Sequence, residues 1–237
     1  MFKKRAGWQV VVIVMGTILG LLLVLFLYSK IFNKSLINLQ KETESDQIVM
    51  QLNTLGDSDA KLKIVVLSTY DCGWSRKYYL ETIKPFIGIM KKEEDKYRDV
   101  SLTYDLIGFR DSSGLIAGQA IYCANEQGKF WEANDILWRL GETGDLKVNY
   151  TVENIIKNLN GIGLNTSKLK KCLENKKYES RILEKAQWYL GKYEKLGFPT
   201  TFLNGETMNI TVKGESLAVG ALGLSDFIIN INKSLNK

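Results

Sequence analysis

An apolar run, a cysteine turn, a helical pattern and a second apolar run follow one another between residues 62 and 109, and this order constrains the fold more than any other feature. The run "KLKIVVLSTY" is nearly continuous in apolar residues from 64 to 67, as in a central strand buried on both faces. Residues 74–97 have apolar side chains at helical spacing, and Pro85 should bend that helix. "VSLTYDLIGF" is typical of the next strand. The chain therefore predicts a βαβ unit with parallel strands and a right-handed crossover.

The remaining pattern adds a helical block and a β-hairpin to this unit. Residues 113–197 are helical in pattern, with starts predicted at Thr151 and Asn165. Residues 198–203, the Asn-Gly pair at 204 and 205, and "NITVKG" predict a strand, a tight turn and a strand, and "ESLAVGA" adds one further short strand. A last helix should begin with Ser225 as its cap. With "QIVMQLNT" as a first strand, the sequence predicts one α/β domain over residues 47–237.

A separate apolar segment precedes this domain. Residues 10–28 form an uncharged run of 19 residues, long enough as a helix to cross a hydrocarbon core of about 30 Å. We therefore expect a transmembrane anchor over residues 8–30, in preference to a cleaved signal peptide, whose apolar core would be shorter. Lys3, Lys4 and Arg5 keep the tail, residues 1–7, in the cytoplasm by the positive-inside rule.

This topology predicts a single-pass protein of the cell membrane. A polar juxtamembrane linker, residues 31–46, would lead to an extracytoplasmic domain. Gly16 and Gly20 form a small-xxx-small pair that would let a partner transmembrane helix approach closely; the alternative is an ordinary spanning helix that contains two glycines.

Composition excludes several function classes. The net charge is +6, but the basic residues are dispersed among 26 acidic ones without a basic stripe, so nucleic-acid binding is not expected. The chain has no His, which removes Ser-His-Asp and Cys-His catalysis and imidazole ligands for zinc. The three cysteines do not have metal-site spacing, so we predict no metal and no cofactor.

Four separated segments carry a family resemblance: "VVLSTYDCGWSRKYY", "AIYCANEQGKFWEANDILW", "LKKCLENKKYESRI" and "LGFPTTFLNG". Together they resemble the DsbA-like branch of the thioredoxin superfamily, in its membrane-anchored form, over about residues 46–237. The resemblance implies a thioredoxin-like core with an inserted helical subdomain at about residues 113–197. It also implies a nucleophilic Cys72 and a cis bond before Pro199. Ser75 stands where the family has its second cysteine.

The chemistry of Cys72 follows from its place before a helix. Unpaired N–H groups at a helix start favour thiolate, which is the nucleophile in disulfide exchange. Ser75 would share this face and donate a hydrogen bond to the sulfur, but it cannot attack a mixed disulfide. Cys72 alone could therefore support isomerisation or exchange with an external thiol. The alternatives are a redox-inactive module that binds protein partners or a subunit of a membrane complex, and a Ser75 introduced to trap mixed disulfides.

Further site residues complete the set of predictions. Phe198 offers a backbone edge to which an extended protein substrate or partner could add, and Gly73, Trp74 and Thr200 flank the same predicted groove. Cys123 and Cys172 should form a structural disulfide, the alternative being two unpaired thiols. Sequons that predict glycosylation begin at Asn33, Asn149, Asn165, Asn209 and Asn232.

Overall fold

The computed structural model describes residues 15–16, 20, 23, 25–30, 53–107, 112–142, 144–193, 196–208, 210–212, 215–217 and 220–236. It divides the chain into two units, Met1–Ile48 and Val49–Lys237. In the first unit the described residues are helical and exposed, Gly16 and Gly20 among them. Within the described residues, no helix is both long enough and apolar enough to cross a bilayer. Most of the predicted anchor and all of the linker lie outside them, so both stay predictions.

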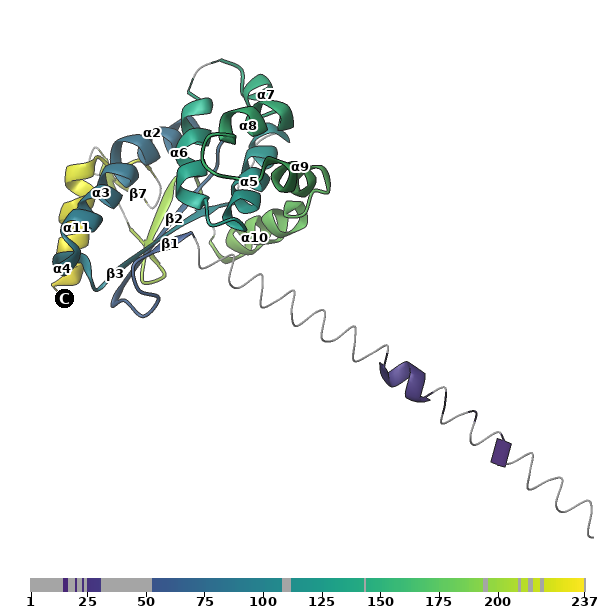
Figure 1. Cartoon of the computed structure of the whole chain (residues 1–237). Coiled ribbons are helices and arrows are strands. Elements are labelled where there is room, and N and C mark those ends of the chain that lie inside the picture. Colours follow the sequence, from purple (N-terminus) through teal and green to yellow (C-terminus); the bar gives the residue numbers. More distant parts are fainter. Residues whose placement is uncertain are drawn as a thin grey trace, which may run out of the picture. The chain divides into compact units, whose positions relative to one another are not determined.

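A five-stranded sheet forms the centre of the second unit, in the order β1-β3-β2-β4-β5 (Figure 1). Its strands are β1 (Thr54–Leu55), β2 (Leu62–Ser68), β3 (Val100–Leu106), β4 (Thr200–Leu203) and β5 (Glu206–Thr207). β2 pairs with β3 in parallel, which confirms the predicted unit, and with β4 in antiparallel orientation. Ile64 and Val66 belong to the main hydrophobic core, whereas Leu67 belongs to a second cluster, so β2 is covered on both faces. The predicted first strand reaches described residues only at its end, in β1.

The helical segment after the cysteine turn is interrupted just before Pro85, the residue at which the sequence predicts a bend. It comprises α2 (Gly73–Tyr78), the π-helical turn η1 (Tyr79–Ile83), α3 (Lys84–Lys92) and α4 (Glu94–Tyr97). Pro85 has no N–H group and its ring crowds the preceding turn. The chain responds with a wider turn, in which the N–H of Lys84 donates to the carbonyl of Tyr79 five residues earlier.

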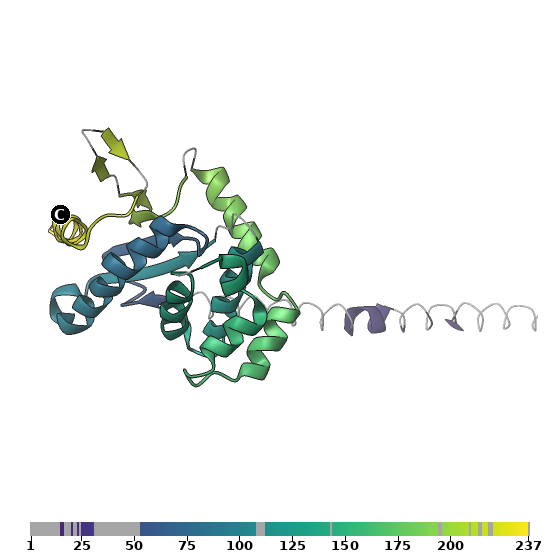
Figure 2. The same cartoon turned by 90° about the horizontal axis from the view of Figure 1, so that it is seen from above.

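The helical block between β3 and β4 contains six described helices, which form a group beside the sheet in Figures 1 and 2. They are α5 (Ser112–Asn125), α6 (Phe130–Leu140), α7 (Leu146–Asn149), α8 (Val152–Leu159), α9 (Thr166–Glu174) and α10 (Glu179–Lys192). Both predicted caps are confirmed. The Thr151 side chain accepts from the N–H of Asn154 at the start of α8, and the Asn165 side chain accepts from the N–H of Lys168 at the start of α9.

The C-terminal region departs from the sequence prediction in two places. Asn204 and Gly205 form the expected turn with positive φ, but the partner of β4 is β5, because a two-residue turn places Glu206 directly opposite Leu203. The segment predicted as that partner instead contains β6 (Ile210–Val212), which pairs with β7 (Glu215–Leu217). The last helix, α11 (Leu224–Leu235), is capped by Gly223 in extended conformation, so the predicted Ser225 cap is wrong.

Aromatic packing fixes the helical block to the region behind the cysteine turn. The ring centroids of Tyr70 and Trp138 are 4.5 Å apart, and those of Tyr79 and Tyr104 are 5.3 Å apart. Trp138 in α6 also stacks on Tyr79 in η1. Because these side chains are buried, the segment that follows the cysteine turn rests on a large, rigid aromatic surface.

Candidate thiol site

Cys72 is the residue that caps the start of α2. Its N–H donates to the carbonyl of Thr69 at 3.3 Å, and its own carbonyl accepts from the N–H of Arg76 at 3.1 Å. The residue is extended (φ −113°, ψ 116°), and its side chain does not cap the helix. The thiol is free and only 7% of the residue is exposed. The turn therefore places a single thiol at the carboxyl end of the buried strand β2.

The loop before β4 meets this thiol. The Phe198–Pro199 bond is cis, which confirms the conformation that the family resemblance implies. Pairing of Leu67 with Thr200 brings the start of β4 to the end of β2. The Cys72 thiol then donates a weak hydrogen bond to the carbonyl of Phe198, with 3.5 Å between sulfur and oxygen.

The surroundings of the loop residues limit how far they are open to solvent. The Phe198 side chain is half-buried and packs against the second cluster, which contains Leu67 and Phe202. Thr200, predicted to bind substrate, is buried, and its hydroxyl donates to the carbonyl of Gly197 at 2.8 Å. Of the predicted binding residues, Phe198 thus offers backbone and part of a ring, whereas the hydroxyl of Thr200 supports the loop.

Ser75 does not make the predicted hydrogen bond to the sulfur. It is fully buried, and its hydroxyl has no hydrogen-bond partner among the described residues. Ser75 and Tyr78 are the two buried residues of α2 and form its core-facing side, whereas Cys72 precedes the helix. Helix geometry therefore turns the serine inward. The sequence spacing alone suggested that the two side chains share a face.

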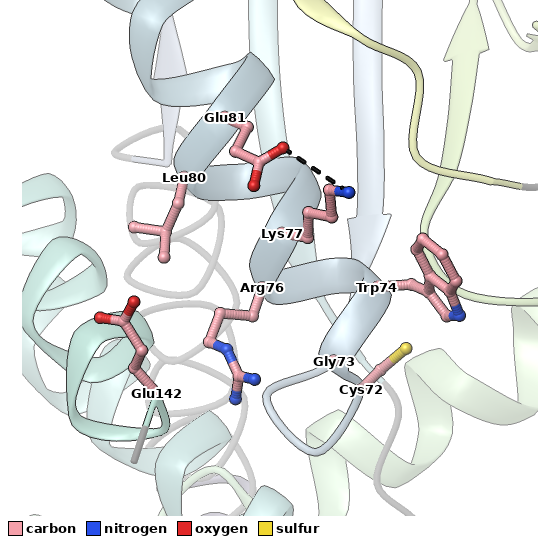
Figure 3. Close-up of a pocket in the computed structure, with 8 residues that line it drawn as sticks. All are labelled: Cys72, Gly73, Trp74, Arg76, Lys77, Leu80, Glu81 and Glu142. Atoms are coloured by element: carbon pink, nitrogen blue, oxygen red, sulfur yellow. Dashed lines mark ion pairs between the residues drawn. The ribbon is translucent and has the colours of Figure 1, made fainter.

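A pocket of about 630 Å³ opens beside Cys72 (Figure 3). Gly73 and Trp74 line it, and Trp74 is 64% exposed; their predicted part in substrate binding stays a prediction. Arg76 donates to the carbonyl of Gly141, the residue that ends α6. The Lys77 ammonium lies 5.8 Å from the centre of the Trp74 ring. The pocket therefore combines an aromatic ring and charged side chains beside the residue Cys72.

The other two cysteines are joined, as predicted. Cys123 in α5 and Cys172 in α9 form a disulfide with an S–S distance of 2.01 Å, and both residues are buried. The bridge links two helices of the inserted block and leaves Cys72 as the free cysteine.

The sequons differ in their surroundings. Asn165 is exposed but caps α9, and Asn149 is half-buried at the end of α7. Asn232 is half-buried in α11 and accepts a hydrogen bond from the Tyr97 hydroxyl at 3.5 Å. Asn33 and Asn209 lie outside the described residues. Glycosylation at these positions stays a prediction.

A buried charge cluster at the end of β3 was not foreseen. The Lys185 ammonium lies 2.6 Å from an Asp105 carboxylate oxygen, and their side chains are 12% and 7% exposed. The Tyr122 hydroxyl donates to the same carboxylate at 3.0 Å. Burial by itself lowers the pKa of Lys185, but Asp105 and Tyr122 outweigh it and raise that pKa above its usual value. Burial and the Asp105 charge also raise the pKa of Tyr122 to about 12. The only sequence signal was a carboxylate inside an apolar strand.

Comparison with solved structures identifies the fold class. BdbD from Bacillus subtilis superposes with a TM-score of 0.61 at 18% identity, covering 78% of this chain and 93% of BdbD. The alpha-DsbA1 protein of Wolbachia pipientis gives 0.60 at 17% identity over 76% and 89% of the two chains. A protein-disulfide isomerase from Novosphingobium aromaticivorans gives 0.54 at 16% identity over 78% and 97%. No family model and no curated protein matches the sequence.

The chain has a DsbA-like thioredoxin fold with an inserted helical subdomain. Within this fold, Cys72 directly precedes the helix that begins at Gly73, and the cis Phe198–Pro199 bond lies in the loop before β4.

Proposed function

We propose that this protein is a membrane-anchored, extracytoplasmic thiol–disulfide exchange protein that acts on protein disulfides through Cys72 alone. The observation that carries the proposal is the free Cys72 thiol at the start of α2, 3.5 Å from the carbonyl oxygen of Phe198 in the loop before β4. The names of the similar structures, which include a thioredoxin-like oxidoreductase and a protein-disulfide isomerase, support the same chemistry. The Cys123–Cys172 disulfide supports an oxidising compartment.

The reaction needs one thiol for its first step. The Cys72 thiolate attacks one sulfur of a substrate disulfide, a bond forms between that sulfur and Cys72, and the other substrate sulfur leaves as a thiolate. An extended substrate can pair its backbone with Phe198, and a substrate N–H that binds the Phe198 carbonyl replaces the Cys72 thiol as its donor. Ser75 cannot displace the substrate, so release requires another thiol, from the substrate itself or from solution.

A trapping experiment with the full-length protein tests this reaction. The protein is incubated with a peptide whose single cysteine is joined by a disulfide to a second peptide, so that the leaving thiol is not retained in the adduct, and the products are mapped by mass spectrometry. We expect a one-to-one adduct on Cys72 that persists until a thiol is added, and no adduct with Cys72→Ser.

The opposite result would favour a different function. If Cys72 reacts only after the protein is unfolded, burial of the residue, which is 7% exposed, prevents disulfide exchange in the folded state. The domain is then a redox-inactive module that binds protein partners. Membrane topology is tested separately by adding protease to intact cells. Digestion of residues 47–237 supports the extracytoplasmic orientation, and full protection of this domain contradicts it.

A further inference from the structure

The turn that carries Cys72 is fastened to the helical block both before and after the cysteine. Before it, the Tyr70 hydroxyl donates to the side chain of Asn134 in α6 at 2.6 Å. After it, Arg76 donates to the carbonyl of Gly141, where α6 ends. In Figure 3 the Cys72 sulfur points away from Arg76, so this contact fixes the helix rather than the thiol itself.

Asp71, the residue next to the cysteine, makes a third link, to α5. One oxygen of its carboxylate accepts from the Thr69 hydroxyl at 2.7 Å. The other oxygen packs onto Gly114, in the first turn of α5, so closely that a Cβ added to this glycine would lie 2.6 Å from it. A carboxylate is also favourable near the start of a helix. The absence of a side chain at Gly114 therefore lets the half-buried Asp71 dock against α5.

Tyr150 connects these contacts within the helical block. Its hydroxyl donates to the carbonyl of Leu137 in α6 at 2.9 Å. Burial raises the pKa of Tyr150, the Arg76 charge lowers that pKa, and the Asp71 charge raises it. Both charges thus lie close enough to act on the same buried hydroxyl. Asp71 therefore faces the helical block and not solvent alone.

The contacts of Cys72 itself hold its side chain weakly. Its N–H lies 3.3 Å from the carbonyl of Thr69, slightly beyond the usual range for such bonds. Its side chain does not cap α2, and the bond from its thiol to the Phe198 carbonyl, at 3.5 Å, is a weak one. An attacking sulfur must be aligned with the bond that it breaks, so a poorly held thiol reacts slowly with a bound substrate.

We propose that Asp71 is a positioning residue for disulfide exchange at Cys72. By docking against the start of α5, it holds the turn so that the sulfur stays at the Phe198 carbonyl, the backbone edge with which an extended substrate would pair. The inference rests on the proposed function of Cys72. Asp71 acts through the peptide bond that it shares with Cys72. Loss of its contact lets the turn open, so that small reagents reach the thiol more often and a paired peptide meets it less often.

Two rates at Cys72 in the full-length protein test this role. The first is formation of the mixed disulfide with an uncharged peptide whose single cysteine is joined by a disulfide to a second peptide, and the second is alkylation by iodoacetamide. Both are measured against pH and compared at their alkaline plateaus, which removes differences in thiol ionisation. Asp71→Ala should lower the peptide rate about tenfold and raise the alkylation rate at least about twofold. A change in the reactivity of the sulfur would instead move both rates in the same direction.

Gly114→Ala tests the same contact from the side of α5 and keeps the Asp71 charge. Alanine favours a helix, but its Cβ displaces the carboxylate, so we expect the same two opposite changes. Gly118→Ala, one turn later, is the matched control: its Cβ meets the Ile182 side chain at 3.5 Å, an ordinary contact, and both rates should stay within about twofold of native. Asp71→Ala combined with Gly114→Ala should be no slower with peptide than Asp71→Ala alone, because both changes remove one contact.

Two failures are distinguishable. If the native protein forms no mixed disulfide while folded, the proposed function fails and the positioning role fails with it. If the native protein reacts but Asp71→Ala moves both rates in the same direction, or leaves both within about twofold, only the positioning role is overturned. Urea midpoints show whether each variant is folded. Should Asp71→Ala not fold, the comparison of Gly114→Ala with Gly118→Ala decides by the same criteria.

Discussion

Removing the Asp105 carboxylate should cost far more stability than removing an exposed one. In Asp105→Asn the Lys185 ammonium loses a charged partner at 2.6 Å and keeps its hydrogen bond to the neutral Tyr122 hydroxyl at 3.0 Å. Because the two charged side chains are 12% and 7% exposed, water cannot replace the lost carboxylate. Removing one partner from a buried pair typically costs about 3–5 kcal/mol, and we expect a loss in this range.

Urea unfolding of the full-length protein provides the measurement. Asp99→Asn is the matched control, because the Lys61–Asp99 pair has a similar distance of 3.1 Å but side chains that are 82% and 42% exposed. It should cost less than about 1 kcal/mol. The double variant Asp105→Asn with Lys185→Met removes the stranded charge and should recover most of the loss. A cost for Asp105→Asn as small as that of the control would refute the reasoning.

The same pair predicts a response to alkaline pH. The folded-state pKa of Lys185 is raised above its usual value of 10.5. A raised pKa contributes stability that is fully present below the usual value and is lost as the pH rises through the raised one. Native protein should therefore lose stability relative to the double variant above about pH 10.5, as measured by the difference in urea midpoints.

Four further variants have expected outcomes. Replacing Cys123 and Cys172 by serine should lower the free energy of unfolding by about 4 kcal/mol, since the bridge spans a sequence separation of 49; an unchanged urea midpoint would contradict this. Ser75→Ala should raise the free energy of unfolding by about 1 kcal/mol because it removes a buried hydroxyl that has no hydrogen-bond partner within the described part of the chain, whereas a clear loss would mean that the hydroxyl is hydrogen-bonded. Gly88→Ala in the exposed part of α3 should stabilise by about 0.5–1 kcal/mol, but Gly205→Ala should destabilise by about 1–2 kcal/mol, because Gly205 has φ +87°; thermal unfolding of both variants checks the opposite signs.

Local patterns in the sequence predicted much of this fold. The apolar run of β2, the cysteine turn and the caps at Thr151 and Asn165 depend on neighbouring residues, and all four appear as expected. The predicted partner of β4 was wrong, because the choice between two short strands depends on where the turn ends rather than on the composition of the strands.

Prediction of the site was less successful, because the site depends on contacts between residues that are far apart in the sequence. Ser75 was expected beside the sulfur, but which side of α2 faces the core is set by packing of Tyr78 and its neighbours. Asp105 and Lys185 are 80 positions apart, so neither one indicates the other. The pocket lined by Arg76 and Glu142 likewise forms only when the end of α6 docks against α2.

The disulfide between α5 and α9 has a consequence for the order in which the molecule is made. Cys72 and Phe198 are separated by 126 positions, and they meet only when β4 closes on β2 across the whole inserted block. The bridge bypasses 49 positions of the chain between Leu106, which ends β3, and Thr200, which begins β4; this is about half of that stretch. Halving such a path lowers the entropic cost of closure by about 0.6 kcal/mol. Oxidation of Cys123 and Cys172 before β4 docks should therefore favour assembly of the thiol site. An oxidant other than this protein, acting on the newly made chain, would then promote formation of that site.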